Sequence, residues 1–502
     1  MNSRHFRGAL LGFSVISVIY WVCAGLRGAY RPIWYDEAVT SHNARLPSVQ
    51  VMLASLYEGT DQNLPLLHFL VRLSYKLFGV SEFSTRLPAL IGFWVLLGCL
   101  FLFLKRRVPL SCAFAGTLLP IVTLAWQYSF EGRAYGILLG CSAVAMLCWA
   151  SAAESQEPRR FWWLAGLSVA LAMALCSHCL SVLIAIPLGA GETVRTFTRR
   201  RVDRAMWLAF LIPAPLILLY PRYLAVARTW DLSARELGMN DIASFYPEVF
   251  RYAIGPLIVA GAAAVCFALI PSRRKEEPAP GFPPHELAAL GGFLAAPPIF
   301  FTVAAISFMF AYSPRYGLIT VIGAAGLLSW LLAKITRGRG RAAAAFAVAL
   351  AVWITGARFR EAWTHRRPPV EEVKAMHQVL VDALGEGLPV LVAQPHIFLQ
   401  ADYYLPPALL QRSYFVTDPE TDRSYAAQQM INQLTTTVAL HVPLHSHVMP
   451  WSEFKHNRRF LLHTGSGYDQ WIFDRLLREK WQVKVRSHND AEAVYEVNAP
   501  SD

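Results

Sequence analysis

Charged residues are scarce in this 502-residue chain. Asp, Glu, Lys and Arg together make up 16% of it, whereas an ordinary soluble domain carries about 25%. Hydrophobic residues make up 55%, and they gather in long runs that the charged residues avoid. This pattern excludes an ordinary soluble protein and predicts a polytopic membrane protein.

Cysteine is absent from the polar C-terminal part of the chain. All 8 cysteines lie in or beside apolar runs, and the last of them is Cys266. The Cys176-x-x-Cys179 pair has no second pair with which to complete a metal site, so we expect buried thiols and no disulfide. The net charge of +12 comes from basic clusters between apolar runs. It therefore indicates membrane topology and no nucleic-acid partner.

The apolar runs predict about 11 transmembrane helices, since a bilayer core needs about 20 apolar residues per helix. If the N-terminus is cytoplasmic, every basic cluster between these helices is cytoplasmic as well. We therefore predict a multi-pass protein of the inner (cytoplasmic) membrane whose C-terminal region is extracytoplasmic, and periplasmic in a Gram-negative cell. The predicted spans are 9–29, 84–104, 108–126, 134–152, 161–177, 179–194, 205–221, 248–270, 287–310, 316–334 and 342–357.

This topology requires that the apolar run at 64–78 does not cross the membrane. His68, Arg72 and Lys76 recur at four-residue intervals and form one polar stripe on a helix. Such a stripe is costly in the bilayer core but suits a helix that lies in the interface. We expect a juxtamembrane helix on the outer face, and a shallow crossing is the alternative.

The region after the last span predicts a small soluble α/β domain. We accordingly divide the chain into a membrane domain at 1–357 and a C-terminal extracytoplasmic domain at 358–502. Helical spacing covers 370–387 and stops at Gly385 or Gly387. We interpret the nearby histidines 441, 445 and 447 as surface or strand residues. β-Branched runs predict strands at 388–393, 413–418, 437–442, 458–463 and 493–497.

Two adjacent carboxylates, Asp36 and Glu37, follow the first span directly. In one interpretation Asp36 only caps a short helix and Glu37 favours its N-terminal end. Other polar residues on the same predicted face have equally ordinary alternatives, such as an ion pair between Arg133 and Glu131 or an interface anchor at Arg315. Acidic residues on one loop and arginines on two others nevertheless suit a site for an anionic lipid head group and a polar acceptor.

Four segments carry a resemblance to a known family: WYDEAVTSHN at 34–43, the stretch at 64–107, YSFEGRAYGILL at 128–139 and SPRYGLI at 313–319. They resemble the membrane-embedded GT-C glycosyltransferases. The likeness is to the branch with protein O-mannosyltransferases, the aminoarabinose transferase of lipid A and rhizobial-type lipopolysaccharide sugar transferases. It covers roughly residues 9–335 and implies a GT-C-like fold.

The resemblance implies inverting transfer of a sugar from a polyprenyl-phosphate-linked donor to an envelope acceptor, which is a glycolipid, polysaccharide or protein. It assigns the family's catalytic carboxylate of the first loop to Asp36, with Glu37 beside it. Relatives often carry Lys-Pro-Pro or Asn-Pro-Pro where this chain has Asn63-Leu64-Pro65, so a lysine contact to the lipid phosphate is not carried over. The residues predicted to bind the donor lipid phosphate are Glu131, Arg133, Tyr135, Arg315 and Tyr316.

Asp61, Asn63, His68 and His178 are further candidates for the site. A divalent metal stays open, with Asp36, Glu37, Asp61, His68 and His178 as its candidate ligands. The expected partners are the sugar donor, the envelope acceptor and membrane lipids. Two other functions remain as alternatives: a polyprenyl-lipid flippase or transporter, and a non-catalytic envelope assembly protein. A transporter predicts ionisable residues near the midplane, whereas here they cluster at the span ends.

Overall fold

The computed structural model describes residues 3–224, 239–270, 281–307, 312–336, 339–418, 426–465 and 470–500. The chain divides into two compact units. The first comprises Met1–Ala29, Asn63–Tyr220 and Glu236–Arg366, and the second comprises Tyr30–Gln62, Pro221–Arg235 and Arg367–Asp502.

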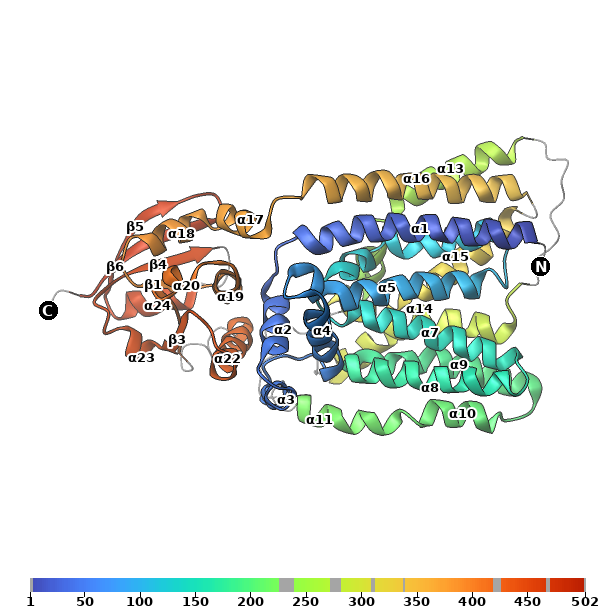
Figure 1. The fold of residues 1–502 in the computed structure, drawn as a ribbon, viewed down its shortest axis with the longest axis horizontal. Coiled ribbons are helices and arrows are strands. Elements are labelled where there is room, and N and C mark those ends of the chain that lie inside the picture. The colour runs from blue at the N-terminus through green and yellow to red at the C-terminus, as the bar shows by residue number, and fades with distance from the viewer. Residues whose placement is uncertain are drawn as a thin grey trace. The chain divides into compact units, whose positions relative to one another are not determined.

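The first unit is a bundle of helices, many of them long and lying side by side (Figure 1). α5 and α7 approach closely because glycines face one another, and a Cβ atom on Gly92 would lie 2.4 Å from the carbonyl oxygen of Gly136. The helices before residue 365 are α1 (Ser3–Tyr30), α2 (Tyr35–Arg45), α3 (Val49–Tyr57), α4 (Pro65–Phe78), α5 (Glu82–Leu104), α6 (Leu110–Leu118), η1 (Leu119–Val122), η2 (Leu124–Phe130), α7 (Tyr135–Glu154), α8 (Arg159–Ser177), η3 (Cys179–Ile184), α9 (Ala185–Arg199), α10 (Arg204–Leu211), η4 (Ala214–Leu219), α11 (Tyr220–Leu224), α12 (Met239–Phe250), α13 (Ile254–Ala268), α14 (Pro284–Ser307), η7 (Pro314–Gly317), α15 (Thr320–Thr336) and α16 (Gly340–Thr364).

The prediction of a polytopic helical protein is confirmed. Among the described residues, 8 helices are long and apolar enough to cross a membrane, or up to 10 if each of two bent pairs is one span. One pair bends by 72° at Thr123, whose backbone is extended. Continuous spans are thus fewer than the predicted eleven, because two predicted spans are bent and a third corresponds to α15, an apolar helix of 17 residues.

The helix at 64–78 is present as α4 and has 14 residues. It is too short for a bilayer core of about 20 residues, which agrees with the prediction that it is not a span. The exposure of its polar stripe increases along the helix, since His68 is buried, Arg72 half-buried and Lys76 exposed. Its position at the outer face stays a prediction.

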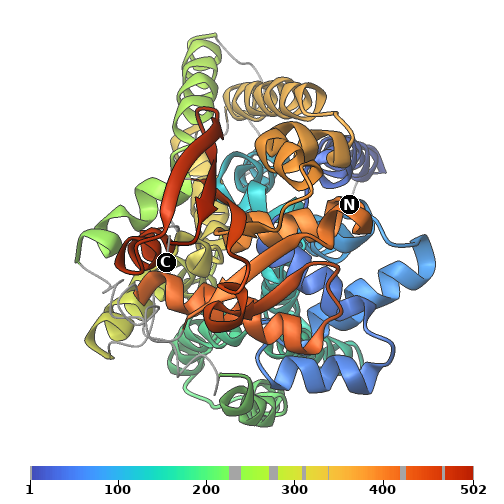
Figure 2. The ribbon, with the colours of Figure 1, turned by 90° about the vertical axis from the view of Figure 1, so that its left-hand side faces the viewer.

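The second unit contains a six-stranded sheet of order β3-β2-β1-β4-β6-β5. The first four strands in that order are parallel, and β6 is antiparallel to both of its neighbours. β5 and β6, coloured red in Figure 2, lie side by side. The strands are β1 (Val390–Val392), β2 (Ser413–Thr417), β3 (His447–Pro450), β4 (Arg459–Gly465), β5 (Gln482–His488) and β6 (Glu492–Asn498).

Alternate residues of a strand point to opposite sides of the sheet. Because both sides carry buried apolar residues, helices cover both faces of this sheet. Val390 and Val392 of β1 lie in one core cluster, whereas Leu391 lies in the other. The first cluster also includes Ile33 and residues of α2, which packs against α19. The second unit thus draws on the segment that follows α1. Its other helices are α17 (Pro369–Met376), α18 (Gln378–Gly385), α19 (Pro395–Tyr404), α20 (Pro407–Leu410), α22 (Ala426–His441), α23 (Trp451–Phe454) and α24 (Gln470–Arg478).

One of the five predicted strands is wrong. Residues 437–442 belong mostly to α22; their β-branched residues favoured a strand, but Val438 and Val442, four residues apart, both pack into the first core cluster. The other four predicted strands are confirmed as β1, β2, β4 and β6. The sequence did not predict β3 or the mostly exposed β5. The helix predicted at 370–387 is two helices that meet at His377.

Candidate functional site

The two adjacent carboxylates have different roles at the start of α2. The helix begins at Tyr35 with Trp34 as its N-cap residue. Glu37 is fully buried, and its Oε2 accepts the backbone N–H of Trp34 at 3.4 Å. This is the reverse half of a capping box. The interpretation of Asp36 as the cap is therefore wrong. The Glu37 side chain makes the capping hydrogen bond, whereas Asp36 lies half-exposed in the first turn.

A third carboxylate, that of Asp61, lies beside the same helix. The Thr40 hydroxyl lies 3.1 Å from the backbone carbonyl oxygen of Asp36 and 2.9 Å from Oδ2 of Asp61. Asp61 is 3% exposed. The structure therefore brings the predicted residues Asp36, Glu37 and Asp61 together in the second unit.

A histidine that the sequence did not single out also lies near Asp36. Burial lowers the pKa of the His396 imidazole, and the Asp36 carboxylate opposes that shift. The ring of His396 meets that of Tyr35 edge to face, with 5.0 Å between centroids. Because His396 is 360 residues further along the chain, no sequence spacing could indicate this neighbour.

Residues of α19 and α22 fix the segment that leads into α2. The backbone N–H of Ile33 donates to the Tyr404 hydroxyl at 2.7 Å, and the Ile33 carbonyl accepts from Gln400 at 2.6 Å. The hydroxyls of Tyr35 and Thr435 lie 3.0 Å apart. Both backbone polar groups of Ile33 are thus satisfied by side chains of one helix, and the direction of α2 is set.

A buried pair of His377 and Glu492 supports Gln400 in turn. Nε2 of His377 hydrogen-bonds Oε1 of Gln400 at 2.9 Å, and Nδ1 hydrogen-bonds Glu492. Burial alone would lower the pKa of His377, but the contact with Glu492 outweighs it and raises that pKa. Burial likewise opposes ionisation of Glu492, yet hydrogen bonds from His377 and His463 lower its pKa to about 2. The Glu492 carboxylate is therefore ionised at neutral pH, and the contact with it favours the protonated form of His377.

In the first unit, a cluster of aromatic and cationic side chains surrounds Tyr135, the first residue of α7. Its ring lies 5.0 Å from that of Tyr128 and 5.3 Å from that of His178. The guanidinium carbon of Arg315 lies 5.9 Å from the Tyr135 ring and 5.7 Å from that of Tyr316. The structure thus brings together four residues predicted from sequence, Tyr135, His178, Arg315 and Tyr316.

Glu131 and Arg133 occupy the turn that leads into this cluster. The backbone N–H of Arg133 donates to the Glu131 carbonyl at 2.7 Å. Glu131 is 5% exposed and Arg133 is 8% exposed. Buried ionised groups are found where a partner offsets their desolvation. Arg133, buried two residues before Tyr135, therefore adds a second cation to this part of the bundle.

The turn at 131–133 lies at the end of the bundle where α1 and α16 also end. Arg27 Nε lies 3.6 Å from a carboxylate oxygen of Glu361, and the Arg27 guanidinium lies 5.6 Å from the Phe130 ring. Trp126 donates its indole N–H to Glu361 at 3.2 Å. The chain therefore leaves the first unit, after α1 and again after α16, at the end that carries Arg133.

The remaining predicted residues do not form a recognisable metal centre. Asn63 and His68 are buried in the first unit, and His178 Nδ1 accepts the backbone N–H of Leu180 at 3.1 Å. Within the described parts of the chain, no group of three or more His, Cys, Asp or Glu side chains could hold a metal ion. The donor set in these parts thus does not fit the divalent metal that the sequence left open.

Arg86, which lies in the resembling stretch at 64–107, has a structural role in the helix bundle. Arg86 of α5 is fully buried, and its guanidinium donates to the carbonyl of Gly28 near the end of α1 at 3.0 Å. This bond ties two helices of the bundle together.

Two of three comparisons with known proteins agree with the sequence motifs. A profile of the dolichyl-phosphate-mannose-protein mannosyltransferase family matches residues 62–221. No curated protein sequence matches the chain. The apo structure of ArnT from Cupriavidus metallidurans matches with a TM-score of 0.59 and 14% identity over 98% of each chain. The structure of the same protein bound to undecaprenyl phosphate gives 0.58 and 13% over 97% of each chain. At these identities the structural likeness shows the fold, and the resemblance predicted from the sequence is confirmed.

Proposed function

We propose that this protein, which resembles the GT-C membrane glycosyltransferases in its motifs and fold, is a sugar transferase of the cell envelope. It transfers a sugar, with inversion, from a polyprenyl-phosphate-linked donor to an envelope acceptor at the outer face of the cytoplasmic membrane. The family match over 62–221 supports the reaction class. The similar fold of a protein bound to undecaprenyl phosphate supports a lipid-phosphate donor.

The observation that carries the proposal is the difference in burial and hydrogen bonding between Asp36 and Glu37. Glu37 is buried and hydrogen-bonded to the helix start, whereas the neighbouring Asp36 is half-exposed in the first turn. A general base needs an ionised group that a substrate hydroxyl can reach. Asp36 is the carboxyl of the pair that a substrate hydroxyl can reach, and the hydrogen bonds of Ile33 and Tyr35 hold the start of its helix in place.

The chemistry requires one such base. The acceptor hydroxyl oxygen forms a bond to the anomeric carbon while the bond from that carbon to the phosphate oxygen breaks. Asp36 accepts the hydroxyl proton, and the bonding electron pair leaves with the polyprenyl phosphate. Because the phosphate is already a good leaving group, no second carboxylate is needed as a general acid, in contrast to a glycosidase.

The departing phosphate gains charge, which Arg133 and Arg315 are suited to stabilise. A guanidinium is planar, permanently charged and able to bind phosphate through two parallel hydrogen bonds. Fixed cations stabilise charge that develops in the transition state without reorganising. The packing of Arg315 against Tyr135 and Tyr316 supports a fixed position for its guanidinium.

Chain connectivity links Asp36 to the membrane. Asp36 lies six residues beyond Tyr30, the last residue of α1. Six residues extend over at most about 20 Å. A lipid-linked donor presents its sugar at the membrane surface, so a base tethered closely behind a span suits such a substrate.

Incubation of the purified protein with radiolabelled polyprenyl-phosphate sugars and envelope extract tests the proposal. The expected result is transfer of label to an envelope component by the wild-type protein and its loss in Asp36→Asn. If the wild-type protein transfers label from none of a panel of polyprenyl-phosphate hexoses and pentoses, the proposal is wrong.

A further inference from the structure

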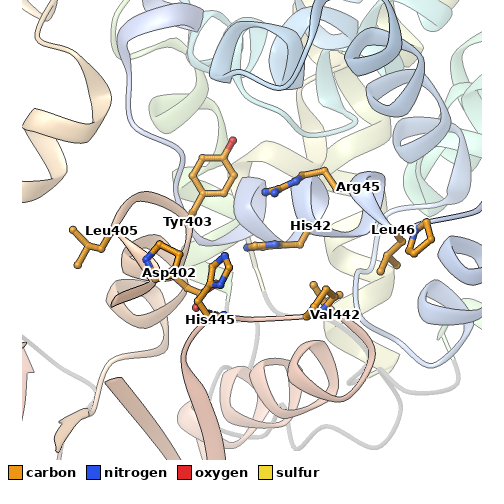
Figure 3. A pocket seen from close by; sticks show the side chains of 11 residues that line it. His42, Arg45, Leu46, Asp402, Tyr403, Leu405, Val442 and His445 are labelled. Atoms are coloured by element: carbon orange, nitrogen blue, oxygen red, sulfur yellow. Dashed lines mark hydrogen bonds between the residues drawn. The ribbon is translucent and has the colours of Figure 1, made fainter. Parts of the chain in front are cut away.

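The second unit contains a pocket of about 380 Å³ between α2, α19 and the segment after α22. Figure 3 shows His42 and Arg45 extending from α2 toward Tyr403 and His445. The pocket is separate from the start of α2, where Asp36 lies. None of the residues that line it was predicted as a site residue, and the proposed mechanism does not use it.

Two buried polar side chains in this pocket each have an atom that the protein does not satisfy. Asp402 is 3% exposed, and its Oδ1 accepts the backbone N–H groups of His445 at 2.9 Å and Ser446 at 2.7 Å. Its Oδ2 has no hydrogen-bond partner among the described residues, and neither has Nε2 of His42, which is 8% exposed. Buried polar atoms of native proteins are almost always hydrogen-bonded. These two atoms therefore call for a partner that enters the pocket.

The electrostatics favour a partner with hydroxyl groups. Burial lowers the pKa of His42 to about 4, although the Asp402 carboxylate opposes that shift, while Arg45 and His445 reinforce it. The imidazole is therefore neutral at physiological pH, and its Nε2 can form one hydrogen bond to an alcohol. Asp402 Oδ2 is an acceptor, so it requires a donor such as an O–H group. A free anion would meet the Asp402 carboxylate and is disfavoured.

The walls of the pocket suit the remaining surface of a sugar. Tyr403 presents its ring at 81° to that of His42, with 6.0 Å between the centroids. The other walls are largely apolar, and Arg45 is exposed at the rim, where it can donate to ring or hydroxyl oxygens. A saccharide combines O–H groups with apolar C–H faces, which aromatic and aliphatic side chains cover.

We propose that this pocket is a subsite for a saccharide unit of the acceptor. The assignment rests on the proposed function and identifies the acceptor of that reaction as a molecule that contains a saccharide. His42 lies on the same helix as Asp36, six residues on, or about 9 Å along the helix axis. An acceptor held there is bound by one end of the helix whose other end carries the base. The subsite thus selects acceptors that already bear sugar.

Binding can be measured on the full-length protein in detergent, without donor, by calorimetric titration. The probe is the lipid-free oligosaccharide fraction that mild acid releases from the envelope. Asp402→Asn keeps an oxygen for the two backbone N–H groups but replaces the second acceptor with an NH₂ donor. We expect binding at least 10-fold weaker, since a hydrogen bond to a charged group contributes about 1.5–3 kcal/mol. Arg45→Ala, at the exposed rim, weakens binding several-fold without a folding defect.

The matched control is Asp382→Asn. Asp382 lies exposed on α18, where it accepts a hydrogen bond from Gln378 at 2.7 Å, and it does not line the pocket. Its variant should bind the oligosaccharides as the wild-type protein does. In a transfer assay, the Asp402 and Arg45 variants should raise KM for the acceptor and leave KM for the donor unchanged.

The results separate this inference from the proposed function. Oligosaccharide binding that the Asp402 and Arg45 variants lose supports the subsite, even if the wild-type protein transfers no sugar. If the wild-type protein transfers sugar and folded Asp402→Asn and Arg45→Ala bind oligosaccharide as it does, the subsite is wrong. Displacement of the probe by inorganic phosphate, in a manner that requires Arg45, would identify an anion site and would also overturn the assignment.

Discussion

The backbone carbonyl of Ile33 accepts a hydrogen bond from Gln400, 2.6 Å away in space and 367 residues away in sequence. The N–H of the same residue is bound by Tyr404 of the same helix, α19. The C-terminal part of the chain thus completes the second unit around the segment that carries Asp36. If Asp36 is the catalytic base, α19 is its positioning element.

Tyr404→Phe tests this positioning. The change removes the acceptor for the buried N–H of Ile33, and leaving such a group unsatisfied costs about 1–3 kcal/mol. We expect a lower Tm and a several-fold lower kcat well below the melting temperature, with unchanged KM for the donor. Tyr414→Phe, the same change on β2, is the control and should retain kcat. A Tyr404→Phe protein that melts earlier but keeps its kcat would show a purely structural role.

The His377–Glu492 pair predicts loss of stability in acid. The folded pKa of Glu492, about 2, is below its ordinary value of 4.5. Its contribution is therefore complete above about pH 4.5 and declines as the pH falls toward 2. The raised pKa of His377 acts in the opposite sense, so its contribution is complete below its ordinary 6.5 and is lost as the pH rises through the higher folded value.

Hydrogen-exchange protection of β4 and β6 in the full-length protein, corrected for intrinsic exchange, measures this dependence. Wild-type protection should fall between pH 5 and about 2.5, and Glu492→Gln should start lower and change less over that range. Parallel pH profiles for the two proteins would contradict the assigned role of the carboxylate.

The sequence predicted the membrane part of the fold well because apolar run length alone indicates spans. It failed at 437–442, where β-branched composition outweighed the four-residue spacing of Val438 and Val442. Asp36, Glu37, Arg133 and Tyr135 could be proposed from motifs. The role of Glu37 was missed because Trp34, at the N-cap, lacks the hydroxyl of an ordinary capping box. His396, Gln400 and Tyr404 were missed because only folding brings them to residues 33–36.

Arg133 is expected to bind the donor phosphate. Arg133→Ala should weaken donor use severely, and Arg133→Lys should recover only part of it, because an ammonium lacks the bidentate fork. KM for the donor and direct binding of polyprenyl phosphate are the measurements. Arg251→Ala is the control, since Arg251 is an exposed arginine of the first unit that packs on Tyr252. Unchanged donor dependence in Arg133→Ala would remove this residue from the site.

The topology predicts which exposed positions face the cell exterior. A cysteine at Ser452, exposed on α23, should react with a membrane-impermeant thiol reagent in intact cells. A cysteine at Thr198, exposed at the end of α9, should react only after the cells are opened. The native cysteines are replaced beforehand to remove background labelling. Protection of Ser452→Cys until lysis would show that the C-terminal region is cytoplasmic.

The turnover of Asp36→Asn tests the central claim most directly. The variant keeps the side-chain size but removes the basicity, so we expect donor binding to persist and kcat to fall by roughly 10²-fold or more. Glu37→Gln should retain most of its turnover, because a glutamine oxygen still accepts the Trp34 N–H. A folded Asp36→Asn protein that binds donor and turns over at the wild-type rate would contradict the assignment of Asp36 as the base.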